Sequence, residues 1–292
     1  MSTRWRVIDL VEFSGEIEVR RGRLVVNGSE QPLSDVACIL TGSATKWNGS
    51  VVALAAKYDV PILSCDWRGV PIATLSSWSD NSRIGARHQA QASLSVPRQK
   101  NAWMRIVRAK VKGQAHNLPT GSQKRQKIES LVHEVRSGDP ANIEASAART
   151  YWSGLFEGES FSRDKDGTGR NYPLNYGYAV LRGSVIRAIT IAGLAPALGL
   201  WHKNRSNAFA LADDLIEPFR PAIDWTVKSL PADAVVTDAA TKVALVGVLS
   251  LPMGRTGETV MTSITQLAQR YANYVEGESD SLDVPTWDMA DG

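Results

Sequence analysis

Ser79-Asp80-Asn81-Ser82 is the stretch at which the sequence changes from one hydrophobic period to another. Before it, from about residue 4 to residue 77, short segments alternate apolar and polar residues, as half-buried strands do. After it, apolar residues recur every three or four positions, as they do in amphipathic helices. The change predicts an α+β fold: a small N-terminal β domain over 1–77, a linker over 78–82 and a larger all-helical domain over 83–275.

Short strands are expected on the N-terminal side of this stretch. Trp5-Arg6-Val7-Ile8-Asp9-Leu10 alternates apolar and polar residues, and Asn27-Gly28 is a strong signal for a two-residue hairpin turn. The apolar residues between Gly49 and Tyr58 instead share one face of a short helix. Strands are predicted at 5–10, 16–20, 23–26, 36–40, 60–65 and 70–75.

The C-terminal side is expected to be helical. Asp139-Pro140 places a capping residue before a proline at the first helical position, which starts one helix firmly. The segment from Glu157 to Arg170 is rich in Gly, Ser and charge, and predicts a mobile loop. Helices are predicted at about 83–95, 98–117, 123–136, 140–155, 174–195, 206–228, 234–250 and 257–275.

The composition favours a globular protein of the cytoplasm. With 292 residues, 43% of them hydrophobic, the chain can bury one large or two medium cores. It has no run of 18 apolar residues, so no membrane span is expected, and its first residues lack the apolar segment of a signal peptide. Cys38 and Cys65 fall in predicted strands and are expected to be buried, reduced thiols.

Charge is distributed unevenly along the chain. Residues 81–136 hold twelve Lys and Arg against only Glu129 and Glu134, a net charge of +10, although the whole chain carries +3. A block of this density predicts a phosphate-rich partner such as nucleic acid. The alternative is a set of amphipathic helices with solvated basic faces. Within this block, Arg98, Arg105 and Arg108 are the candidate DNA contacts.

The C-terminal residues 276–292 form an acidic tail. They carry six acidic residues, no basic residue and one large aromatic, Trp287. Such a composition cannot bury enough apolar surface to offset its ordering entropy, so the tail is predicted to be disordered and dispensable. If it docks on a partner protein or on the basic block, Pro285-Thr286-Trp287 is the expected anchor.

Two neighbouring motifs carry the candidate chemistry. Gly199-Leu200-Trp201-His202 precedes Leu211-Ala212-Asp213-Asp214-Leu215-Ile216-Glu217-Pro218-Phe219-Arg220-Pro221. Asp214 and Glu217 would share a face of a helix capped by Ser206. A histidine with hard oxygen ligands suits Mn²⁺ or Mg²⁺. On spacing alone, an acidic solvated helix face beside an unrelated histidine is the more ordinary explanation.

Glu144 is the candidate for a third ligand. It falls in Asn142-Ile143-Glu144-Ala145-Ser146-Ala147-Ala148-Arg149-Thr150-Tyr151-Trp152, on a helix face shared with small and aromatic residues. Such a face is packed, and a carboxylate there is costly unless it is paired or bound to a metal. A salt bridge to Arg149 or Arg187 explains Glu144 equally well.

Four segments carry a likeness to a known family: Glu144–Trp152, Leu174–Leu181, Gly199–His202 and Asp213–Pro221. In these segments the chain resembles the CRISPR adaptation integrases, the Cas-one family, and most closely its type II branch. The last two of the four, in this order, are specific. The likeness reaches weakly into the N-terminal half at 48–54 and 61–66, so it spans nearly the whole chain except the tail.

The resemblance implies a function in CRISPR antiviral defence: spacer acquisition by a helical catalytic domain that inserts short DNA into a repeat array. It implies Glu144, His202 and Glu217 as metal ligands for Mg²⁺ or Mn²⁺, with Asp214 as a further acidic residue near the metal. The implied reaction is phosphoryl transfer, in which a DNA 3′-hydroxyl attacks a phosphodiester. Further basic residues near these ligands are candidate phosphate clamps: Arg149, Arg187, Lys203, Arg205 and Arg220.

The resemblance also implies an assembly. The expected partners are double-stranded DNA, a second copy of the chain bound through the N-terminal domain, the small Cas-two protein between two such dimers, and, as candidates, effector proteins of the type II branch. One departure is Thr168, where relatives often carry Asp; it puts the register of the 157–171 loop in doubt. Two other functions stay open: a metal nuclease that only cleaves DNA, and a non-catalytic DNA-binding scaffold.

Overall fold

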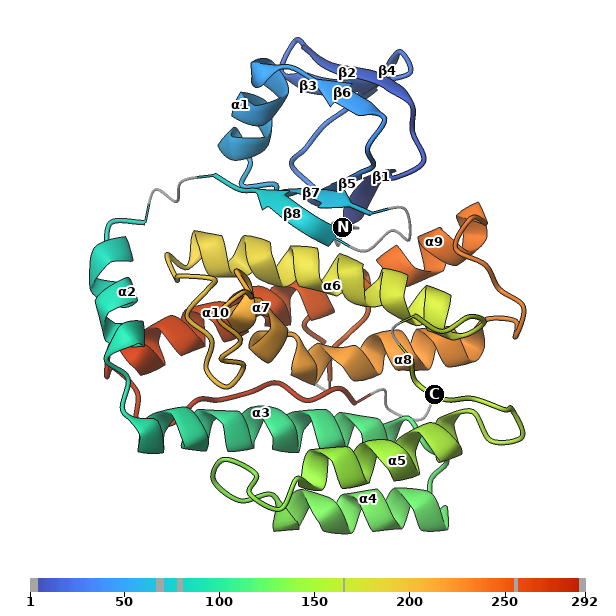
Figure 1. The fold of residues 1–292 in the computed structure, drawn as a ribbon, viewed down its shortest axis with the longest axis vertical. Helices are drawn as coiled ribbons and strands as arrows, with labels where there is room; N and C mark the ends of the chain where they lie inside the picture. The colour runs from blue at the N-terminus through green and yellow to red at the C-terminus, as the bar shows by residue number, and fades with distance from the viewer. Residues whose placement is uncertain (1–4, 67–70, 78–80, 165, 255–256, 289–292) are drawn as a thin grey trace.

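The computed structural model describes residues 5–66, 71–77, 81–164, 166–254 and 257–288, and places strands before helices (Figure 1). The predicted α+β class is confirmed. The N-terminal part contains β1 Arg6–Leu10, β2 Gly15–Arg20, β3 Arg23–Val26, β4 Ser29–Gln31, β5 Val36–Thr41, β6 Thr45–Trp47, α1 Gly49–Lys57, β7 Ile62–Cys65 and β8 Pro71–Leu75. Residues 78–80 of the predicted linker lie outside the described ranges.

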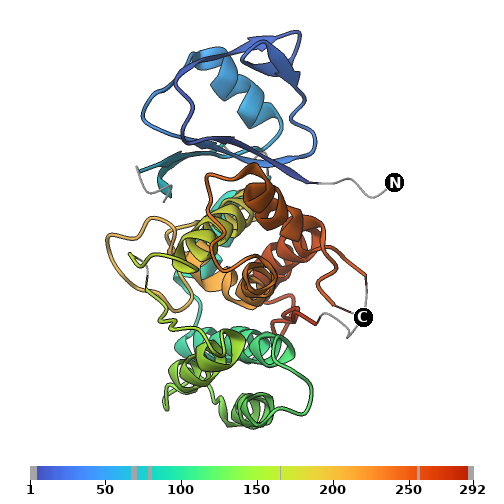
Figure 2. The ribbon, with the colours of Figure 1, turned by 90° about the vertical axis from the view of Figure 1, so that its right-hand side faces the viewer.

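In the described residues, the helical part consists of α-helices and two short 3₁₀ turns (Figures 1 and 2). Its elements are α2 Ile84–Ala92, α3 Val96–His116, α4 Gln123–Glu134, α5 Ile143–Leu155, α6 Asn171–Ile191, α7 Ala210–Leu215, η1 Glu217–Phe219, α8 Arg220–Ser229, α9 Ala239–Gly247, η2 Val248–Ser250 and α10 Val260–Val275. None of these helices is long and apolar enough to cross a membrane.

The described strands of the N-terminal part form two four-stranded sheets. One has the order β1-β5-β7-β8, with the first three strands parallel, and the other has the order β4-β3-β2-β6. The predicted hairpin turn joins β3 to β4, where Asn27 and Gly28 both have positive φ, 48° and 76°. This is the backbone that two-residue hairpins require, so the expected turn is confirmed.

Strand β5 explains how the two parts are held together. All six of its residues are buried, because one face packs inside the N-terminal part and the other packs on α6. Gly183 of α6 allows this close contact, since a Cβ there would come within 2.8 Å of the Leu63 side chain and 3.0 Å of Cys38 Sγ. Cys38 and Cys65 are free and buried, as expected.

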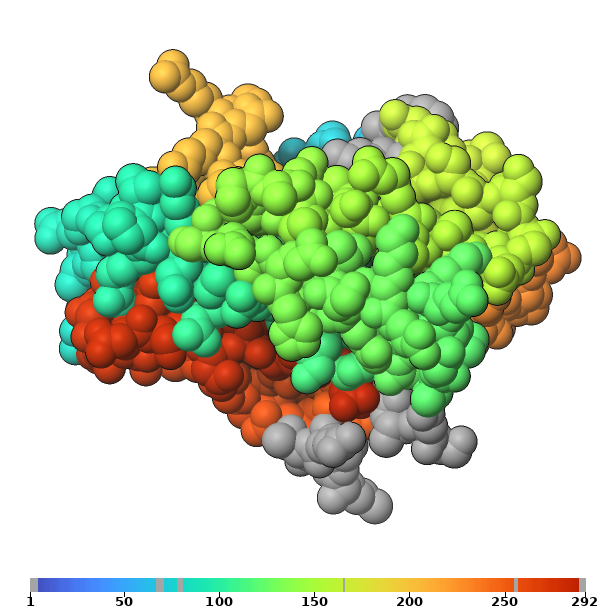
Figure 3. Space-filling model, turned by 90° about the horizontal axis from the view of Figure 1, so that it is seen from below, coloured from blue at the N-terminus to red at the C-terminus, as the bar shows by residue number. Residues whose placement is uncertain are grey.

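Helix α6 lies between the first sheet and helices α7, α8 and α10, and α9 packs beside it and also contacts β1 (Figures 1 and 2). On the far side, α3 packs on α4 and α5. Viewed from below, α3, α4 and α5 form one continuous surface, and the C-terminal residues border it (Figure 3). The helical residues share one large apolar core with β5 and β7.

The helix predicted over 206–228 is broken, which corrects the expected geometry of the acidic cluster. Ser206 lies in a turn and does not cap a helix; α7 begins only at Ala210, and the chain changes to a 3₁₀ turn at Glu217. Pro218 and Pro221 cause the break, because proline has no N–H to donate within a helix. Asp214 and Glu217 therefore face different partners, although they are only three residues apart.

The start of α5 also differs from the prediction. The helix begins at Ile143 and not at Pro140, because Asn142 adopts the left-handed conformation with φ of 51°. Asp139 still caps the start of the helix, since its carboxylate accepts hydrogen bonds from the free backbone N–H groups of Ile143, at 2.9 Å, and Glu144, at 3.0 Å.

The predicted disorder of the tail is wrong for residues 276–288. This segment runs along α3, and Leu282 and Trp287 are fully buried (Figure 1). Trp287 Nε1 donates to Asn117 Oδ1 at 2.8 Å, and Glu276 pairs with Arg83 at 2.7 Å and Arg87 at 3.0 Å. Composition missed this because basic residues far away in the sequence neutralise the acids. Residues 289–292 of the tail lie outside the described ranges.

Candidate active site

Asp214 joins the two candidate motifs. Its carboxylate is fully buried and accepts from the backbone N–H groups of Leu200 at 2.6 Å and Trp201 at 2.9 Å, and from His202 Nδ1 at 2.6 Å. Gly199 lets the loop close this tightly, because a Cβ there would lie 2.4 Å from the His202 carbonyl oxygen. The two motifs, 199–202 and 211–221, are therefore joined directly in the structure through the Asp214 carboxylate.

The pair of His202 and Asp214 fixes the orientation of the imidazole. The hydrogen bond from Nδ1 to Asp214 raises the pKa of His202, partly opposed by burial. Because an ionised carboxylate can only accept, Nδ1 carries the hydrogen and Nε2 is left to bind a ligand. Metal-binding histidines commonly donate their second ring N–H to a carboxylate in this way.

Helix α3 supports the loop that carries His202. The rings of Trp103 and Trp201 stack with centroids 5.5 Å apart, and His202 meets the edge of Trp103 at 5.8 Å. Trp103 is buried, and its ring lies between the core and the loop. The loop itself is exposed at Lys203 and Arg205 and projects from the surface (Figure 3).

Glu144 and Glu217 converge on the ammonium group of Lys110. Lys110 Nζ lies 2.5 Å from Glu144 Oε1 and 2.5 Å from Glu217 Oε2. Arg220 Nε lies 2.8 Å from the other oxygen of Glu217. Burial raises the pKa of Glu217, but the charges of Arg220 and Lys110 outweigh it and lower the value to about 2. Glu144 thus pairs with neither of the arginines considered as its partner from sequence.

The carboxylate of Glu217 fits a metal ligand. Its Oε2 atom is buried, and no well-oriented hydrogen bond reaches it even though Lys110 Nζ is close. A buried carboxylate oxygen normally has a partner, so this atom is suited to a cation. Two carboxylates on one cation position, with an oriented imidazole nearby, are the hard donors that Mg²⁺ or Mn²⁺ accepts.

The three predicted metal ligands do not all meet in this structure. Among the described residues, no group of three His, Cys, Asp or Glu side chains is close enough to hold an ion. Glu144 and Glu217 share a cation position, whereas His202 pairs with Asp214. His202 and Glu217 nevertheless line the same pocket. The predicted convergence of all three therefore stays a prediction.

That pocket, of about 470 Å³, is rich in guanidinium groups. Arg163, Arg182 and Arg220 line it together with His202 and Glu217. Arg182 pairs with Asp213 at 2.8 Å, and Arg163 donates to Asn175 Oδ1 at 2.7 Å. None of Lys110, Arg163 and Arg182 is among the site residues predicted from the sequence. Arg182 could have been found from the sequence. It stands four residues after Tyr178, which belongs to the segment 174–181 that carries the family likeness, so both residues lie on the same face of the helix.

The predicted DNA-contact residues fall into three groups. Arg98, Arg108 and Arg187 hold the fold together by donating to the backbone carbonyls of Tyr274, Val135 and Asp59, respectively. Arg220 lies in the pocket, and Arg105 contacts Asn101 on its own helix at 3.2 Å. The side chains of Arg149, Lys203 and Arg205 are exposed.

A carboxylate absent from the sequence-based candidates lies beneath the pocket. Asp224 of α8 is buried and accepts hydrogen bonds from the hydroxyls of Tyr151, at 3.0 Å, and Tyr178. Burial raises the pKa of Asp224 to about 6, although these hydroxyls and Arg220 oppose the shift. Arg220 in turn lies over the Tyr178 ring at 4.5 Å, so this cluster supports the residue that pairs with Glu217.

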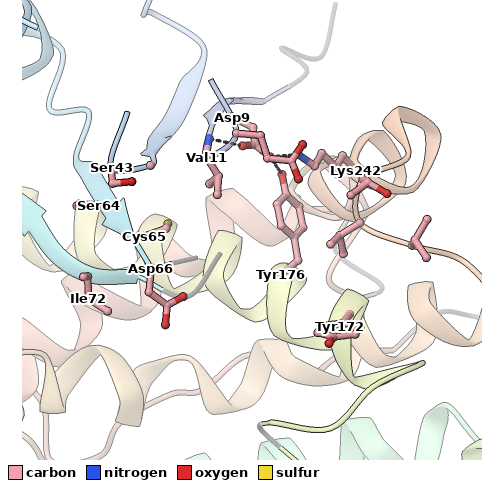
Figure 4. Close-up of a pocket in the computed structure, with 15 residues that line it drawn as sticks. Asp9, Val11, Ser43, Ser64, Cys65, Asp66, Ile72, Tyr172, Tyr176 and Lys242 are labelled. Carbon is pink, nitrogen blue, oxygen red and sulfur yellow. Dashed lines mark hydrogen bonds and ion pairs between the residues drawn. The ribbon is translucent and has the colours of Figure 1, made fainter. Parts of the chain in front are cut away.

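A separate pocket of about 750 Å³ lies between the first sheet and the helical part (Figure 4). It contains none of the predicted site residues. Asp9 lies at its wall and accepts from Lys242 at 2.8 Å and from the Tyr176 hydroxyl at 2.9 Å. These contacts connect β1 with α6 and α9, so the pocket marks the junction of the two parts.

Comparison with known proteins identifies the family. A family model described as CRISPR associated protein Cas1 matches residues 10–255. The chain belongs to the Cas1 family. The CRISPR-associated endonuclease Cas1 of Neisseria meningitidis serogroup C (strain 8013) is 38% identical over 230 residues, which are 76% of this chain and 75% of that protein. The resemblance stated from the motifs is thus confirmed, and the chain is an enzyme of this Cas1 endonuclease family.

Solved structures show the same fold at low identity. A casposase bound to integration product has a TM-score of 0.77 and 19% identity, over 96% of this chain and 92% of that one. A Cas6-RT-Cas1–Cas2 complex has a TM-score of 0.76 and 14% identity, over 99% of this Cas1 chain and 37% of that chain. The arrangement of a strand-rich N-terminal part and a helical part is therefore shared.

Proposed function

We propose that this Cas1 protein is a metal-dependent DNA integrase that inserts short foreign DNA into a CRISPR repeat array. Support comes from its family, from the likeness to a casposase solved with an integration product, and from the described site. The observation that carries the proposal is the convergence of Glu144 and Glu217 on a single cation position beside an oriented His202.

Glu144, Glu217 and His202 Nε2 would hold Mg²⁺ or Mn²⁺. When bound, the ion would act as a Lewis acid on the scissile phosphodiester and lower the cost of its developing negative charge. Asp214 acts as a positioning residue, because it fixes both the imidazole and the loop backbone that carries it.

The arginines of the pocket would bind and orient the DNA backbone. Arg163, Arg182 and Arg220 present planar guanidinium groups, which suit phosphate oxygens. Contacts to the phosphate backbone do not distinguish one base sequence from another, so any preference for a particular DNA site must come from other contacts. The exposed Lys203 and Arg205 on the His202 loop and Arg149 on α5 are proposed to extend this surface. Binding should weaken steeply as salt rises.

The expected partners follow from the same proposal. One of the structural relatives is a complex that contains Cas1 and Cas2, and this supports a Cas2 partner here. We propose a homodimer through the N-terminal part, a location in the cytoplasm, and type II effector proteins as further partners. Light scattering of the purified chain at micromolar concentration should give the mass of a dimer; a monomer mass would contradict it.

A joining assay tests the reaction. The chain, its Cas2 partner, a short DNA duplex and a supercoiled plasmid with CRISPR repeats are incubated with Mn²⁺ or with a chelator. Covalent joining that needs Mn²⁺ supports the integrase. Cleavage alone would mean a nuclease in which water replaces the 3′-hydroxyl, and retention of DNA without either would mean a scaffold.

Glu217→Gln is the informative variant for this assay. It keeps the size of the side chain but removes the charge that a cation needs, so joining should fall by at least about 100-fold, with DNA retention preserved. Glu129→Gln is the matched control, because Glu129 pairs with Arg125 on an exposed helix face. Equal joining by both variants would remove Glu217 from the site.

A further inference from the structure

Lys110 occupies the position between the two carboxylates. Its ammonium nitrogen lies 2.5 Å from an oxygen of Glu144 and 2.5 Å from an oxygen of Glu217, and only 13% of its side chain is exposed. Carboxylate oxygens lie at about the same distance, 2.0–2.6 Å, from hard divalent cations. Lys110 and a metal ion therefore exclude each other from this position.

The charges of the cluster are already balanced. The negative charges of Glu144 and Glu217 are matched by the positive charges of Lys110 and Arg220. A divalent ion added to this partly buried group would introduce two uncompensated positive charges, which is unfavourable where water is largely excluded. The ion becomes acceptable only if Lys110 leaves and a new negative charge enters.

DNA supplies that charge next to the cluster. Glu217 and Arg220 also line the arginine-rich pocket, so a phosphate bound there lies beside the group that holds Lys110. Lysine carries a compact charge on a flexible four-carbon stem, and its ammonium can turn from a carboxylate to a phosphate. A phosphate in the pocket thus gives Lys110 a second partner.

We propose that Lys110 is an internal counterion that keeps the divalent metal out of the site until DNA binds. This inference rests on the metal-dependent function proposed above. In the free protein the ammonium fills the gap between the carboxylates. When DNA enters, the ammonium turns to a phosphate, and both carboxylates become available to the ion. Since coupling between two ligands is reciprocal, Mn²⁺ should also tighten DNA binding by the same factor.

The test measures Mn²⁺ binding by titration calorimetry on the full chain, with and without a short duplex whose 3′ ends are dideoxy and cannot be joined. The natural protein should bind Mn²⁺ at least tenfold more tightly with the duplex. Lys110→Met should bind Mn²⁺ tightly without DNA and gain less than twofold from the duplex. Lys112→Met is the matched control, since Lys112 is exposed on the same helix, and it should behave like the natural protein.

Folding of the variants is followed by thermal melting. Lys110→Met leaves two carboxylates facing each other, so Lys110→Gln is prepared beside it, and Mn²⁺ should raise the melting temperature of both by more than that of the natural protein. If neither variant folds, the Mn²⁺ affinity of the natural protein with and without the duplex still tests the inference. No duplex effect on its Mn²⁺ affinity, or equal affinity in Lys110→Met, would overturn the inference but leave the proposed function. Absence of Mn²⁺ binding in every sample would overturn both.

Discussion

His202 and Asp214 form one unit but should respond differently to substitution. Nearly half of the His202 side chain is exposed, so His202→Ala should change the melting temperature by only about 2 °C. It should nevertheless lower strand joining by more than about 100-fold, because a ligand of the proposed metal is lost. Joining assays and thermal melting on the same sample check both effects.

Substitution of Asp214 should instead lower the stability of the protein strongly and strand joining less than substitution of His202 does. Its two oxygens accept four hydrogen bonds from the 200–202 loop, and Asp214→Asn replaces one acceptor by a donor. The lost bonds should lower the free energy of unfolding by about 3 kcal/mol and joining by about 10–100-fold. An Asp214→Asn protein with natural stability would show that the carboxylate does not hold the loop.

Asp224 should make stability depend on pH. Its pKa of about 6 in the folded protein lies above its ordinary value of 3.8, so the folded state binds the proton more tightly. Its contribution to stability is complete below about pH 4 and is lost as the pH rises through 6. Relative to the natural protein, Asp224→Asn should therefore gain stability between pH 4 and 7, by up to about 3 kcal/mol.

Urea unfolding of both proteins at several pH values measures this difference. Asp233→Asn is the control, because Asp233 is exposed on the loop after α8. A difference between Asp224→Asn and the natural protein that stays constant from pH 4 to 7 would contradict the raised pKa.

At the scale of elements, local patterns predicted most helices and all of the described strands except the two short ones, β4 and β6. Alternation identified β1 and β2, a short apolar run identified β5, and Asn27-Gly28 identified the turn between β3 and β4, because these signals lie within a few neighbouring residues. The break at Glu217 was missed although Pro218 and Pro221 mark it. Periodicity alone continued the helix across two prolines.

The site was only partly predictable for a physical reason. Glu144, His202, Asp214 and Glu217 stand in recognisable motifs, and the structure pairs His202 with Asp214. Lys110 stands in no motif, since its partner Glu144 is 34 residues away and Glu217 further still. The basic block likewise concealed that Arg98 and Arg108 bond to backbone carbonyls inside the fold.

The C-terminal segment should stabilise the helical part. Trp287 is buried against Gly113 of α3 and Trp225 of α8, whose ring centroid lies 6.2 Å away. Trp287→Ala should therefore lower the free energy of unfolding by about 3–5 kcal/mol, and truncation after Val275 should cost at least as much. This reverses the expectation of a dispensable tail.

Urea unfolding of the purified chain checks the role of this segment. Asp280→Ala is the matched control, because the Asp280 side chain is fully exposed in the same segment and its ion pair with Arg98 is long, at 4.0 Å. Unchanged stability of Trp287→Ala would mean that the segment merely rests on α3.

For the whole molecule, the junction between the two parts should control whether they unfold together. The core of the helical part continues into β5 and β7, so the natural protein should unfold in one calorimetric transition. Asp9 adds ion-pair and hydrogen-bond contacts to α9 and α6, and Arg187 donates to Asp59 O at 2.8 Å while its guanidinium lies over Trp5. Both residues connect elements that are distant in the sequence.

Removing these contacts should separate the unfolding of the N-terminal part from that of the helices. In Asp9→Ala/Arg187→Met the strand-rich part loses its polar anchors, and since a unit of this size buries a limited core, it should melt first. Calorimetry should then resolve two transitions, the second close to the natural melting temperature. Arg20→Ala serves as the control, because Arg20 is exposed and pairs with its neighbour Glu18 on the same strand, β2. If the double variant keeps one transition at the natural temperature, apolar packing between β5, β7 and α6 alone couples the two parts.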